Sequence, residues 1–221
     1  MSFAEKAIKY FNELGPPDFA INGVELINPY ESPEVKIVVR KFYKKFYSDD
    51  SERIFVFGIN PGRFGGGLTG ISFTDPVALK GNCGIENDFG KRKELSSKFI
   101  YKVIDEFGGT KKFFSKVYLS ALYPFAITRN EKNYNYYDDK SLAEILNPEI
   151  IRTVKTQIKF GARKDVAILL GKKNAEYFSK INDEFKFFER MVVLEHPRYI
   201  MQYRMKKIDF YIRKYIDAIS I

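Results

Sequence analysis

Four short apolar runs constrain the fold of this chain more than any other feature of its sequence. They are rich in Val, Ile, Leu, Phe and Tyr, and they occupy residues 53–59, 116–122, 165–170 and 190–195. Runs of this length and composition predict β-strands, and their nearly uninterrupted apolar character is typical of strands buried on both faces. Because segments with helical spacing of apolar residues separate them, the pattern predicts a parallel sheet covered by helices on both sides.

Apolar residues at helical spacing also locate the helices. They are predicted at residues 2–14, 33–47, 94–107 and 139–160, in a short segment after Gly171, and in a basic amphipathic segment near 204–219. Pro16 and Pro17 are expected to stop the first helix, because proline cannot continue one. Gly108 and Gly109 are expected to close the third, because glycine readily adopts the left-handed conformation of a helix end.

The remaining segments are predicted to be turns and loops. Residues 81–91 are rich in turn-forming residues, and TRNEKNYNYYDD at 128–139 is predicted to be a polar loop. Neither has the composition of an interdomain linker, so we predict a single domain spanning residues 1–221. The predicted fold class is α/β, with three layers (α/β/α) around a central four-stranded parallel sheet.

Composition excludes several classes of protein. The 221 residues include one cysteine, Cys83, which excludes a disulfide framework, a cysteine-ligated zinc and an iron–sulfur cluster. The first residues, MSFAEKAIKYFNEL, are amphipathic and charged, unlike a secretory signal, and no run approaches the length of a membrane span. We therefore expect a soluble, cytoplasmic protein.

The excess of basic residues bears on possible partners. Lys and Arg number 37 against 28 Asp and Glu, a net charge of +9 that favours a polyanionic partner through steering and counterion release. A basic surface without such a partner is the alternative. Aromatic residues, all Phe and Tyr, make up 16% of the chain and could stack on bases, although most are expected in the core.

Polar side chains stand at the ends of three predicted strands. Asn60 follows the first, Ser120 lies near the end of the second, and His196, the only histidine, follows the fourth. Ligands of parallel α/β sheets bind outside the carboxyl ends of the strands, so we expect these residues at one site. Each also has a structural interpretation, because Asn before Pro is a common turn signal and a histidine at a strand end often serves packing alone.

The glycine-rich loop after the first strand partly matches a nucleotide-binding motif. Gly65, Gly67 and Gly70 satisfy the spacing GxGxxG, but a dinucleotide site needs a helix that opens within the loop and holds pyrophosphate. ISFTDP follows instead, with β-branched residues and Pro76, so we expect no helix to start there and no dinucleotide site. The absence of Gly-Lys-Ser and Gly-Lys-Thr excludes a P-loop.

Three segments of the chain resemble a known family. GINPGRFGGGLTGISF at 58–73 resembles the first motif of the single-strand-selective monofunctional uracil-DNA glycosylases, which reads approximately GxNPGPFGMxQTGxPF. HPR at 196–198 resembles the second motif of the uracil-DNA glycosylase superfamily, which begins His-Pro-Ser, and YLSALYPF at 118–125 aligns with the segment where the family carries His-Asn-Leu-Cys-Pro. The resemblance runs from about residue 53 to 215, and HPRYIMQYR makes the chain look like a divergent bacterial subtype.

The resemblance implies a function for the predicted site. It implies a uracil-DNA glycosylase-like fold and a monofunctional enzyme of base excision repair. Such an enzyme hydrolyses the N-glycosidic bond of uracil, and of other deaminated or oxidised bases, in single-stranded or duplex DNA and leaves an abasic site. No metal or organic cofactor is implied, and we expect a monomer. A bifunctional lyase needs a nucleophilic amine, and neither motif contains a lysine.

Roles for individual residues follow from the same resemblance. Asn60 would orient the attacking water, and neutral His196 would donate a hydrogen bond to the base oxygen on which negative charge accumulates. Phe73 would stack on the extruded base, and the open space at Gly62 predicts tolerance of 5-substituted uracils. The complete predicted base-binding set is Gly62, Phe64, Gly65, Phe73 and Ser120, and the predicted DNA-binding set is Arg63, Arg198, Gln202 and Arg204.

The chain departs from the family pattern at three positions. Ala121 stands where the family carries its base-reading Asn, so either Ser120 and backbone groups replace that contact or specificity has broadened toward deaminated purines. Arg63 and Arg198 stand where the family has Pro and Ser, and either could hold phosphate at the mouth of the site.

Several alternatives remain open at this point. The chain could be a non-catalytic nucleic-acid-binding module on the same fold, or an enzyme of small nucleosides or nucleotides. Phe73 and Cys83 could simply pack in the core or a turn. Tyr199, Ile200 and Met201 could fill the vacated base stack or anchor the last helix. The basic series that follows His196 could contact DNA or form a solvated helix face.

Overall fold

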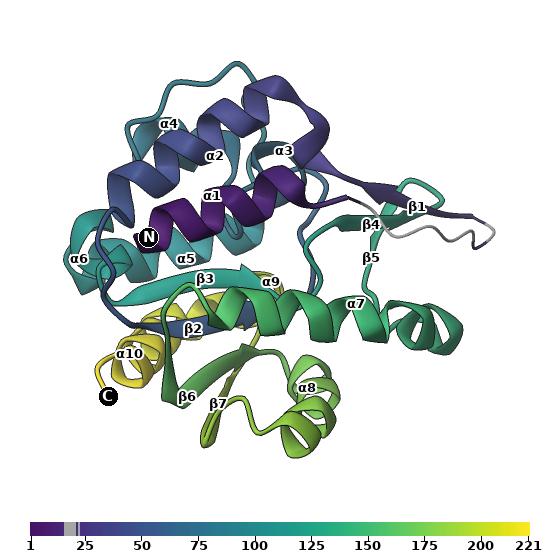
Figure 1. Cartoon of the computed structure of the whole chain (residues 1–221). Helices are drawn as coiled ribbons and strands as arrows, with labels where there is room; N and C mark the ends of the chain where they lie inside the picture. The colour runs from purple at the N-terminus through teal and green to yellow at the C-terminus, as the bar shows by residue number, and fades with distance from the viewer. Residues whose placement is uncertain (16–20, 22) are drawn as a thin grey trace.

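A four-stranded parallel sheet lies at the centre of the molecule (Figure 1). Its strands are β2 (Arg53–Gly58), β3 (Val117–Ala121), β6 (Ala162–Leu170) and β7 (Arg190–Leu194), in the order β3-β2-β6-β7. All three pairings are parallel, which confirms the predicted sheet. The computed structural model describes residues 1–15, 21 and 23–221.

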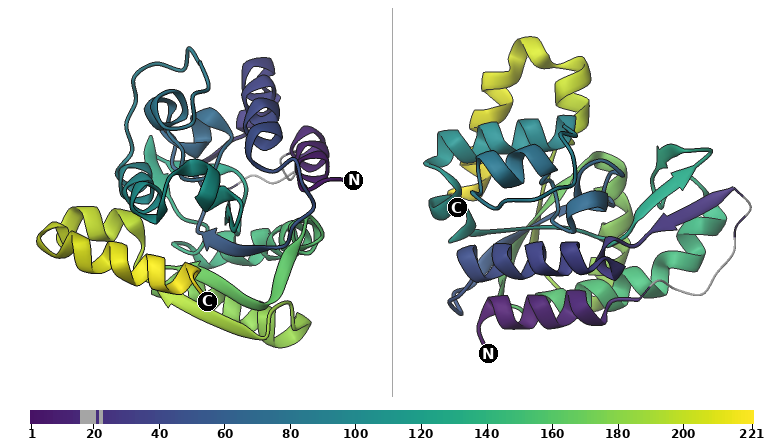
Figure 2. Two further views of the ribbon diagram at one scale, coloured as in Figure 1. Left: turned by 90° about the vertical axis from the view of Figure 1, so that its left-hand side faces the viewer. Right: turned by 90° about the horizontal axis from the view of Figure 1, so that it is seen from above.

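Helices cover both faces of this sheet, which confirms the three predicted layers (Figures 1 and 2). The rings of Phe55 and Phe57 on β2 face one side, with centroids 6.1 Å from Phe3 and 5.7 Å from Phe178. Val56 faces the opposite side. The first side is covered by α1 (Phe3–Glu13), α7 (Lys140–Ile158) and α8 (Lys172–Phe185), and the second by α5 (Leu95–Phe107) and α10 (Ile208–Ile219).

The longer predicted helices are confirmed, with shifts of a few residues at their ends. Helix α1 starts with a capping box between Ser2 and Glu5, and α2 (Pro33–Phe46) starts at a Ser32 cap followed by proline. Helix α5 ends at Gly108, which has the expected left-handed conformation. Helix α8 has 14 residues and is longer than predicted. The predicted stop at Pro16 and Pro17 lies outside the described residues.

Shorter helical segments were not predicted. They are η1 (Pro29–Glu31), α4 (Pro76–Gly81) and α6 (Thr110–Phe114). The helix predicted near 204–219 is preceded by a separate helix, α9 (Pro197–Tyr203), and is divided into η2 (Met205–Lys207) and α10. Helices α9 and α10 form a hairpin that projects from the side of the molecule where α5 packs against both (Figure 2).

A second, antiparallel sheet replaces much of the predicted polar loop. Its strands are β1 (Val24–Ile27), β4 (Ala126–Arg129) and β5 (Lys132–Tyr134), in the order β1-β4-β5. The loop prediction was wrong here because β4 and β5 are joined by a two-residue turn, in which Asn130 and Glu131 have φ of +50° and +58°. Positive φ at both turn positions matches the twist of a hairpin. The hairpin carries residues 133–135 to the edge of the main sheet.

Within the part of the chain that the structure describes, no helix is both long and apolar enough to cross a lipid bilayer.

Candidate active site

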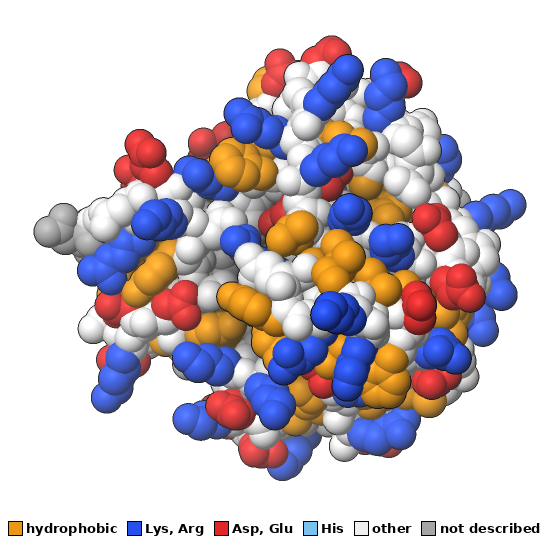
Figure 3. All heavy atoms as spheres, turned by 180° about the vertical axis from the view of Figure 1, so that it is seen from behind, with side chains coloured by type: hydrophobic (Ala, Val, Ile, Leu, Met, Phe, Trp, Pro, Cys, Tyr) orange, Lys and Arg blue, Asp and Glu red, His pale blue; other side chains and the backbone are white. Residues whose placement is uncertain are grey.

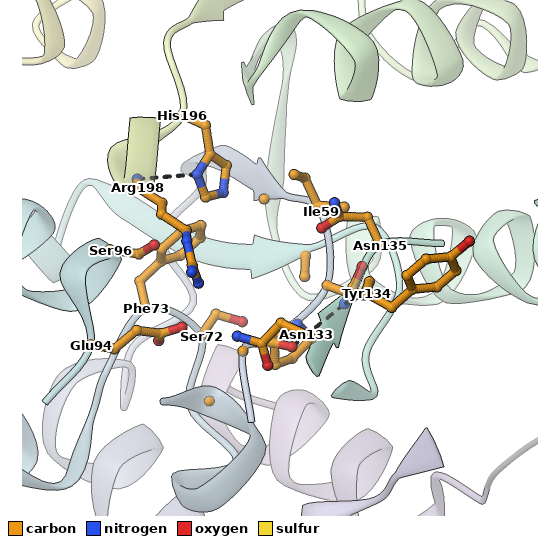
Figure 4. A pocket seen from close by; sticks show the side chains of 16 residues that line it. Ile59, Ser72, Phe73, Glu94, Ser96, Asn133, Tyr134, Asn135, His196 and Arg198 are labelled. Atoms are coloured by element: carbon orange, nitrogen blue, oxygen red, sulfur yellow. Dashed lines mark hydrogen bonds between the residues drawn. The ribbon is translucent and has the colours of Figure 1, made fainter. Parts of the chain in front are cut away.

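A narrow cavity of about 70 Å³ opens at the carboxyl ends of the central strands (Figure 4). Strand β2 lies between β3 and β6. The connection from β2 leads to β3 on one side of it, and the connection from β3 leads to β6 on the other side, so the loops diverge at this edge of the sheet. Such a divergence is where parallel α/β sheets form ligand clefts. The polar side chains that line the cavity are those of Asn60, Ser72, Glu94, Ser96, Asn133, Asn135, His196 and Arg198.

The glycine-rich loop forms one wall of the cavity. Its first turn is closed by the N–H groups of Gly65 and Gly67, which donate to the carbonyl oxygen of Gly62 at 3.1 and 2.9 Å. The expectation that no helix starts in this loop was wrong, because Gly66–Thr69 form α3. This single turn ends at Gly70, where φ is +71°, and does not continue into the longer helix that a dinucleotide site needs.

Phe73 forms a flat apolar surface beside His196. The two ring centroids are 6.2 Å apart, and the planes are inclined by 47°. Gly58, at the end of β2, allows this position, because a Cβ atom there would overlap the phenyl ring. Phe73 has a φ of +56°, which is uncommon for a bulky side chain and marks a residue held by its surroundings. Thr69 helps to hold the turn, since its Oγ1 donates to the carbonyl oxygen of Thr74 at 2.7 Å.

His196 presents one ring nitrogen to the cavity. Its Nδ1 accepts a hydrogen bond from the backbone N–H of Arg198 at 3.2 Å and caps the start of α9 (Figure 4). The proton of the neutral imidazole is therefore on Nε2. Burial, with a smaller contribution from the charge of Arg198, lowers the pKa of His196 to about 4. At neutral pH the side chain is thus an uncharged Nε2–H donor.

Asn60 is fixed in place by the β4–β5 hairpin. Its Nδ2 donates to the carbonyl oxygen of Tyr134 at 3.0 Å, and its Oδ1 accepts from the N–H of Tyr136 at 3.2 Å. The side chain therefore joins the end of β2 to the segment after β5. An amide oxygen can accept two hydrogen bonds, so Oδ1 retains one acceptor site for a water molecule.

The other predicted base-binding residues divide into two groups. Gly62 and Phe73 line the cavity, and Gly65 lies behind Glu94, which lines it. Phe64 does not line the cavity. Its side chain is 37% exposed, and its ring centroid is 4.4 Å from the guanidinium carbon of Arg63 and 5.1 Å from that of Arg92. Phe64 thus belongs to a basic rim outside the cavity.

The prediction for Ser120 requires a correction. Its hydroxyl points into the core and donates to Oε1 of Gln157, which also accepts from Tyr118. Successive side chains of a strand point to opposite faces, so Ala121 lines the cavity and Ser120 does not. A side chain held in this way cannot replace an amide at position 121.

Glu94 is a cavity residue that the sequence did not indicate. It is the N-cap of α5, but its side chain does not cap the helix and points into the cavity (Figure 4). A Cβ atom on Gly62 would overlap Oε1, and one on Gly65 would overlap Oε2. The carboxyl group thus occupies the space that was expected to admit a 5-substituent at Gly62. No local pattern distinguishes Glu94 from an ordinary acidic residue at a helix start.

The surroundings of Glu94 favour its protonated form. Burial, reinforced by the negative charge of Asp75, raises the pKa of Glu94 to about 7, although the charge of Arg198 opposes this shift. Asp75 also holds the backbone, because its Oδ2 accepts the N–H of Glu94 at 2.8 Å.

Two further amides reach the cavity from the β4–β5 hairpin. Oδ1 of Asn133 accepts the backbone N–H of Arg63 at 3.1 Å, and this bond ties the hairpin to the glycine-rich loop. Nδ2 of Asn135 donates to Oδ2 of Asp138 at 2.8 Å. Both residues lie in the segment predicted to be a polar loop, where asparagine is common, so only the fold reveals their position.

The predicted DNA-binding residues come from the glycine-rich loop and from α9 with its C-cap, and one of them reaches the cavity. Arg198 lines it, Arg63 lies on the adjacent loop, and Gln202 and Arg204 are exposed at the end of α9. The α9–α10 hairpin projects from one face of the molecule. On this face, basic side chains surround exposed apolar ones (Figure 3). The exposed apolar side chains of the α9–α10 hairpin are Tyr199, Tyr203, Met205 and Phe210. By contrast, Ile200 and Met201 are buried and anchor α9 in the core.

Other candidate chemistry finds no support in the described residues. No group of three or more His, Cys, Asp or Glu in them could hold a metal ion. Cys83 is buried, with its sulfur 3.0 Å from the hydroxyl of Tyr101, and burial raises the pKa of its thiol to about 11. It therefore packs as a small apolar residue.

Comparison with known proteins agrees with this geometry. Residues 45–220 match the family model of the uracil DNA glycosylase superfamily. The crystal structure of wild-type SMUG2 from Pedobacter heparinus is similar, with 41% sequence identity and a TM-score of 0.96, over 100% of this chain and 97% of that chain. None of the curated proteins matches the sequence. The chain therefore belongs to the uracil DNA glycosylase superfamily, in its SMUG-type branch, and is a DNA glycosylase that hydrolyses N-glycosyl bonds.

Proposed function

We propose that the enzyme excises uracil, together with other deaminated or oxidised bases, from DNA and leaves an abasic site. The observation that carries this proposal is the neutral Nε2–H of His196 beside the ring of Phe73, in one cavity at the carboxyl ends of the central strands. A base enters such a cavity only after it leaves the helix stack, because the glycosidic carbon is not accessible within a duplex.

His196 would act on the leaving group. Cleavage of the glycosidic bond leaves negative charge on the departing base, and the Nε2–H would donate to the base oxygen on which that charge accumulates. The donor is oriented before the reaction by the bond from Arg198 to Nδ1. A preorganised donor of this kind contributes about 3–4 kcal/mol, or about 10²–10³ in rate.

Asn60 would orient the attacking water. Its side chain is held by Tyr134 and Tyr136, so the free acceptor site on Oδ1 has a fixed direction. An amide is a poor base, and catalysis would therefore rely mainly on stabilising the leaving base. Within the described part of the chain no lysine lines the cavity, which favours hydrolysis by water over attack by an amine.

DNA would bind across the basic rim. Arg63 and Arg198 would contact phosphates beside the extruded nucleotide, and the exposed Gln202 and Arg204 would contact the flanking strand. We propose that the enzyme acts on DNA as a monomer.

An oligonucleotide panel tests this function. Single-stranded and duplex substrates with one uracil, hypoxanthine or xanthine are incubated with the enzyme, and abasic sites are cleaved with alkali. We expect cleavage at uracil that is lost in the double variant Asn60→Ala/His196→Ala. Salt-dependent DNA binding without excision would instead indicate a binding module. Activity on free nucleosides alone would indicate a small-molecule enzyme.

A further inference from the structure

The carboxyl group of Glu94 has no role in the proposed mechanism. It enters the cavity from the side opposite His196 (Figure 4). Among the described residues no hydrogen bond or ion pair engages either carboxyl oxygen, whereas the backbone N–H is fixed by Asp75. A half-buried carboxyl group without a partner is costly unless a ligand supplies one.

The amides of the cavity are more fully engaged than Glu94. Both polar atoms of Asn60 bond to the backbone of the β4–β5 segment. Oδ1 of Asn133 and Nδ2 of Asn135 also have partners. Considering contacts among the described residues, Glu94 is the one carboxyl or amide side chain of the cavity lining with both polar atoms free to contact a base. Within the same set of contacts, Nδ2 of Asn133 near Gly62 is also free.

We propose that Glu94, as a neutral carboxylic acid, reads the edge of the extruded base. A carboxylic acid places a C=O acceptor next to an O–H donor, and this pair complements a ring N–H next to a carbonyl oxygen. That edge is common to uracil, hypoxanthine and xanthine. Since either carboxyl oxygen can hold the proton, the carbonyl can lie on either side of the ring N–H. This inference rests on the proposed function and names the substrate class of the same cavity.

The position of Glu94 supports this role. The carboxyl oxygens lie against Gly62 and Gly65, where no side chain could be added without moving them. Nδ2 of Asn133 is 3.6 Å from the point that a Cβ of Gly62 would occupy, so a second donor faces the same spot. Glu94 and Ala121 both line the cavity, so Glu94 supplies a carboxyl group to a cavity in which the side chain at position 121 supplies no polar atom.

The charges around Glu94 set the pH range in which it can donate. Burial raises the pKa of Glu94 to about 7, the charge of Arg198 opposes this shift, and the charge of Asp75 adds to it. His196, across the cavity, is uncharged above pH 5 because its pKa is about 4. Below about pH 7 the acid can donate to the base carbonyl. Above that pH the carboxylate repels the same oxygen, so excision should decline.

Single-turnover excision of uracil from single-stranded DNA between pH 5.5 and 8.5 tests the inference. The wild-type rate should fall above pH 7, by up to about tenfold per pH unit. Glu94→Gln supplies a donor and an acceptor at every pH, so it should retain excision and lose this decline. Glu94→Ala should lower the rate about 10–100-fold at pH 6, because the base edge loses its partner.

The control is Glu106→Gln, which changes an exposed carboxyl near the end of α5 and should follow the wild type. If Glu94→Gln keeps the wild-type pH profile, or Glu94→Ala excises uracil at the wild-type rate, the inference is wrong. If Glu94→Ala fails to fold, the pH profile of the isosteric Glu94→Gln still tests the inference. Absence of excision by the wild type on any substrate would instead contradict the proposed function.

Discussion

The two walls of the cavity are built in different ways. The motif wall consists of the loop after β2, including Phe73, together with His196 after β7. The edge wall consists of Glu94 at the start of α5 with Asn133 and Asn135 from the β4–β5 hairpin. The motif wall comes from the ends of parallel strands, whereas the edge wall comes from segments outside the main sheet.

The two walls also differ in how their polar groups are held. In the motif wall, His196 is oriented by a backbone bond, and Phe73 is held with a positive φ. In the edge wall, Asn133 and Asn135 each have one bonded amide atom, but among the described residues no hydrogen bond or ion pair engages the carboxyl oxygens of Glu94. We infer that the motif wall carries the chemistry common to every base and the edge wall selects among bases. Substitutions in the motif wall should therefore lower the excision of every base, whereas substitutions in the edge wall should change the preference among bases.

The largest effect is expected at His196. His196→Ala should lower single-turnover excision about 10²–10³-fold on every substrate, because the donor to the leaving base is lost. His196→Gln keeps an N–H donor at the ε position, where its amide nitrogen replaces the ring Nε2, so the loss of excision should be smaller. A residual rate within tenfold of the wild type for His196→Ala would remove this residue from the mechanism.

A smaller loss is expected at Phe73. Phe73→Ala removes the surface on which the base stacks and should lower kcat/KM about 10–100-fold. Phe73→Tyr keeps an aromatic face and should retain most of the wild-type kcat/KM. Steady-state kinetics on uracil and hypoxanthine provide the measurement. Equal activity of the Ala and Tyr variants would show that Phe73 is only a packing residue.

Asn60 connects the two walls, so its variants should affect both. Asn60→Ala removes two hydrogen bonds to the segment 134–136. Excision should fall about tenfold or more as the water loses its acceptor, and the Tyr136 amide should exchange faster with solvent. Asn60→Asp keeps an acceptor for Tyr136 and should protect that amide better than Ala does. An unchanged exchange rate of the Tyr136 amide in Asn60→Ala would contradict the view that Asn60 holds the segment 134–136 in place.

The smallest effect on excision is expected at Ser120. Its hydroxyl bonds to Gln157 in the core, so Ser120→Ala should change excision less than about threefold while lowering the free energy of unfolding by about 1 kcal/mol. Urea unfolding and excision assays measure the two effects. A selective loss of uracil excision with unchanged stability would return Ser120 to the base-binding set.

The sequence predicts the motif wall well for physical reasons. Apolar runs that end in Asn60 and His196 place both residues at one edge of a parallel sheet, because the carboxyl ends of such strands meet there. The same alternation of strands and helices predicts the three layers, which the structure confirms. Each of these inferences needs only the periodicity of a single segment.

The edge wall could not be predicted in the same way. Strand β5 is three residues long and mostly exposed, so its composition resembles a loop. Glu94 is distinguished only by where α5 starts relative to Gly62, a relation that depends on tertiary packing. The error at Ser120 was one of strand phase, since a shift of one residue exchanges the core face for the cavity face.

The central claim is that a neutral Nε2–H of His196 faces the base, and nitrogen NMR of the imidazole tests it most directly. His196 is the only histidine, so a ¹⁵N-labelled sample gives one unambiguous pair of ring resonances. We predict the Nε2–H tautomer at pH 7, titration near pH 4, and a shift of the Nε2–H signal on addition of uracil-containing DNA. A proton on Nδ1, titration near pH 6.5, or a signal that the DNA leaves unchanged would contradict the account.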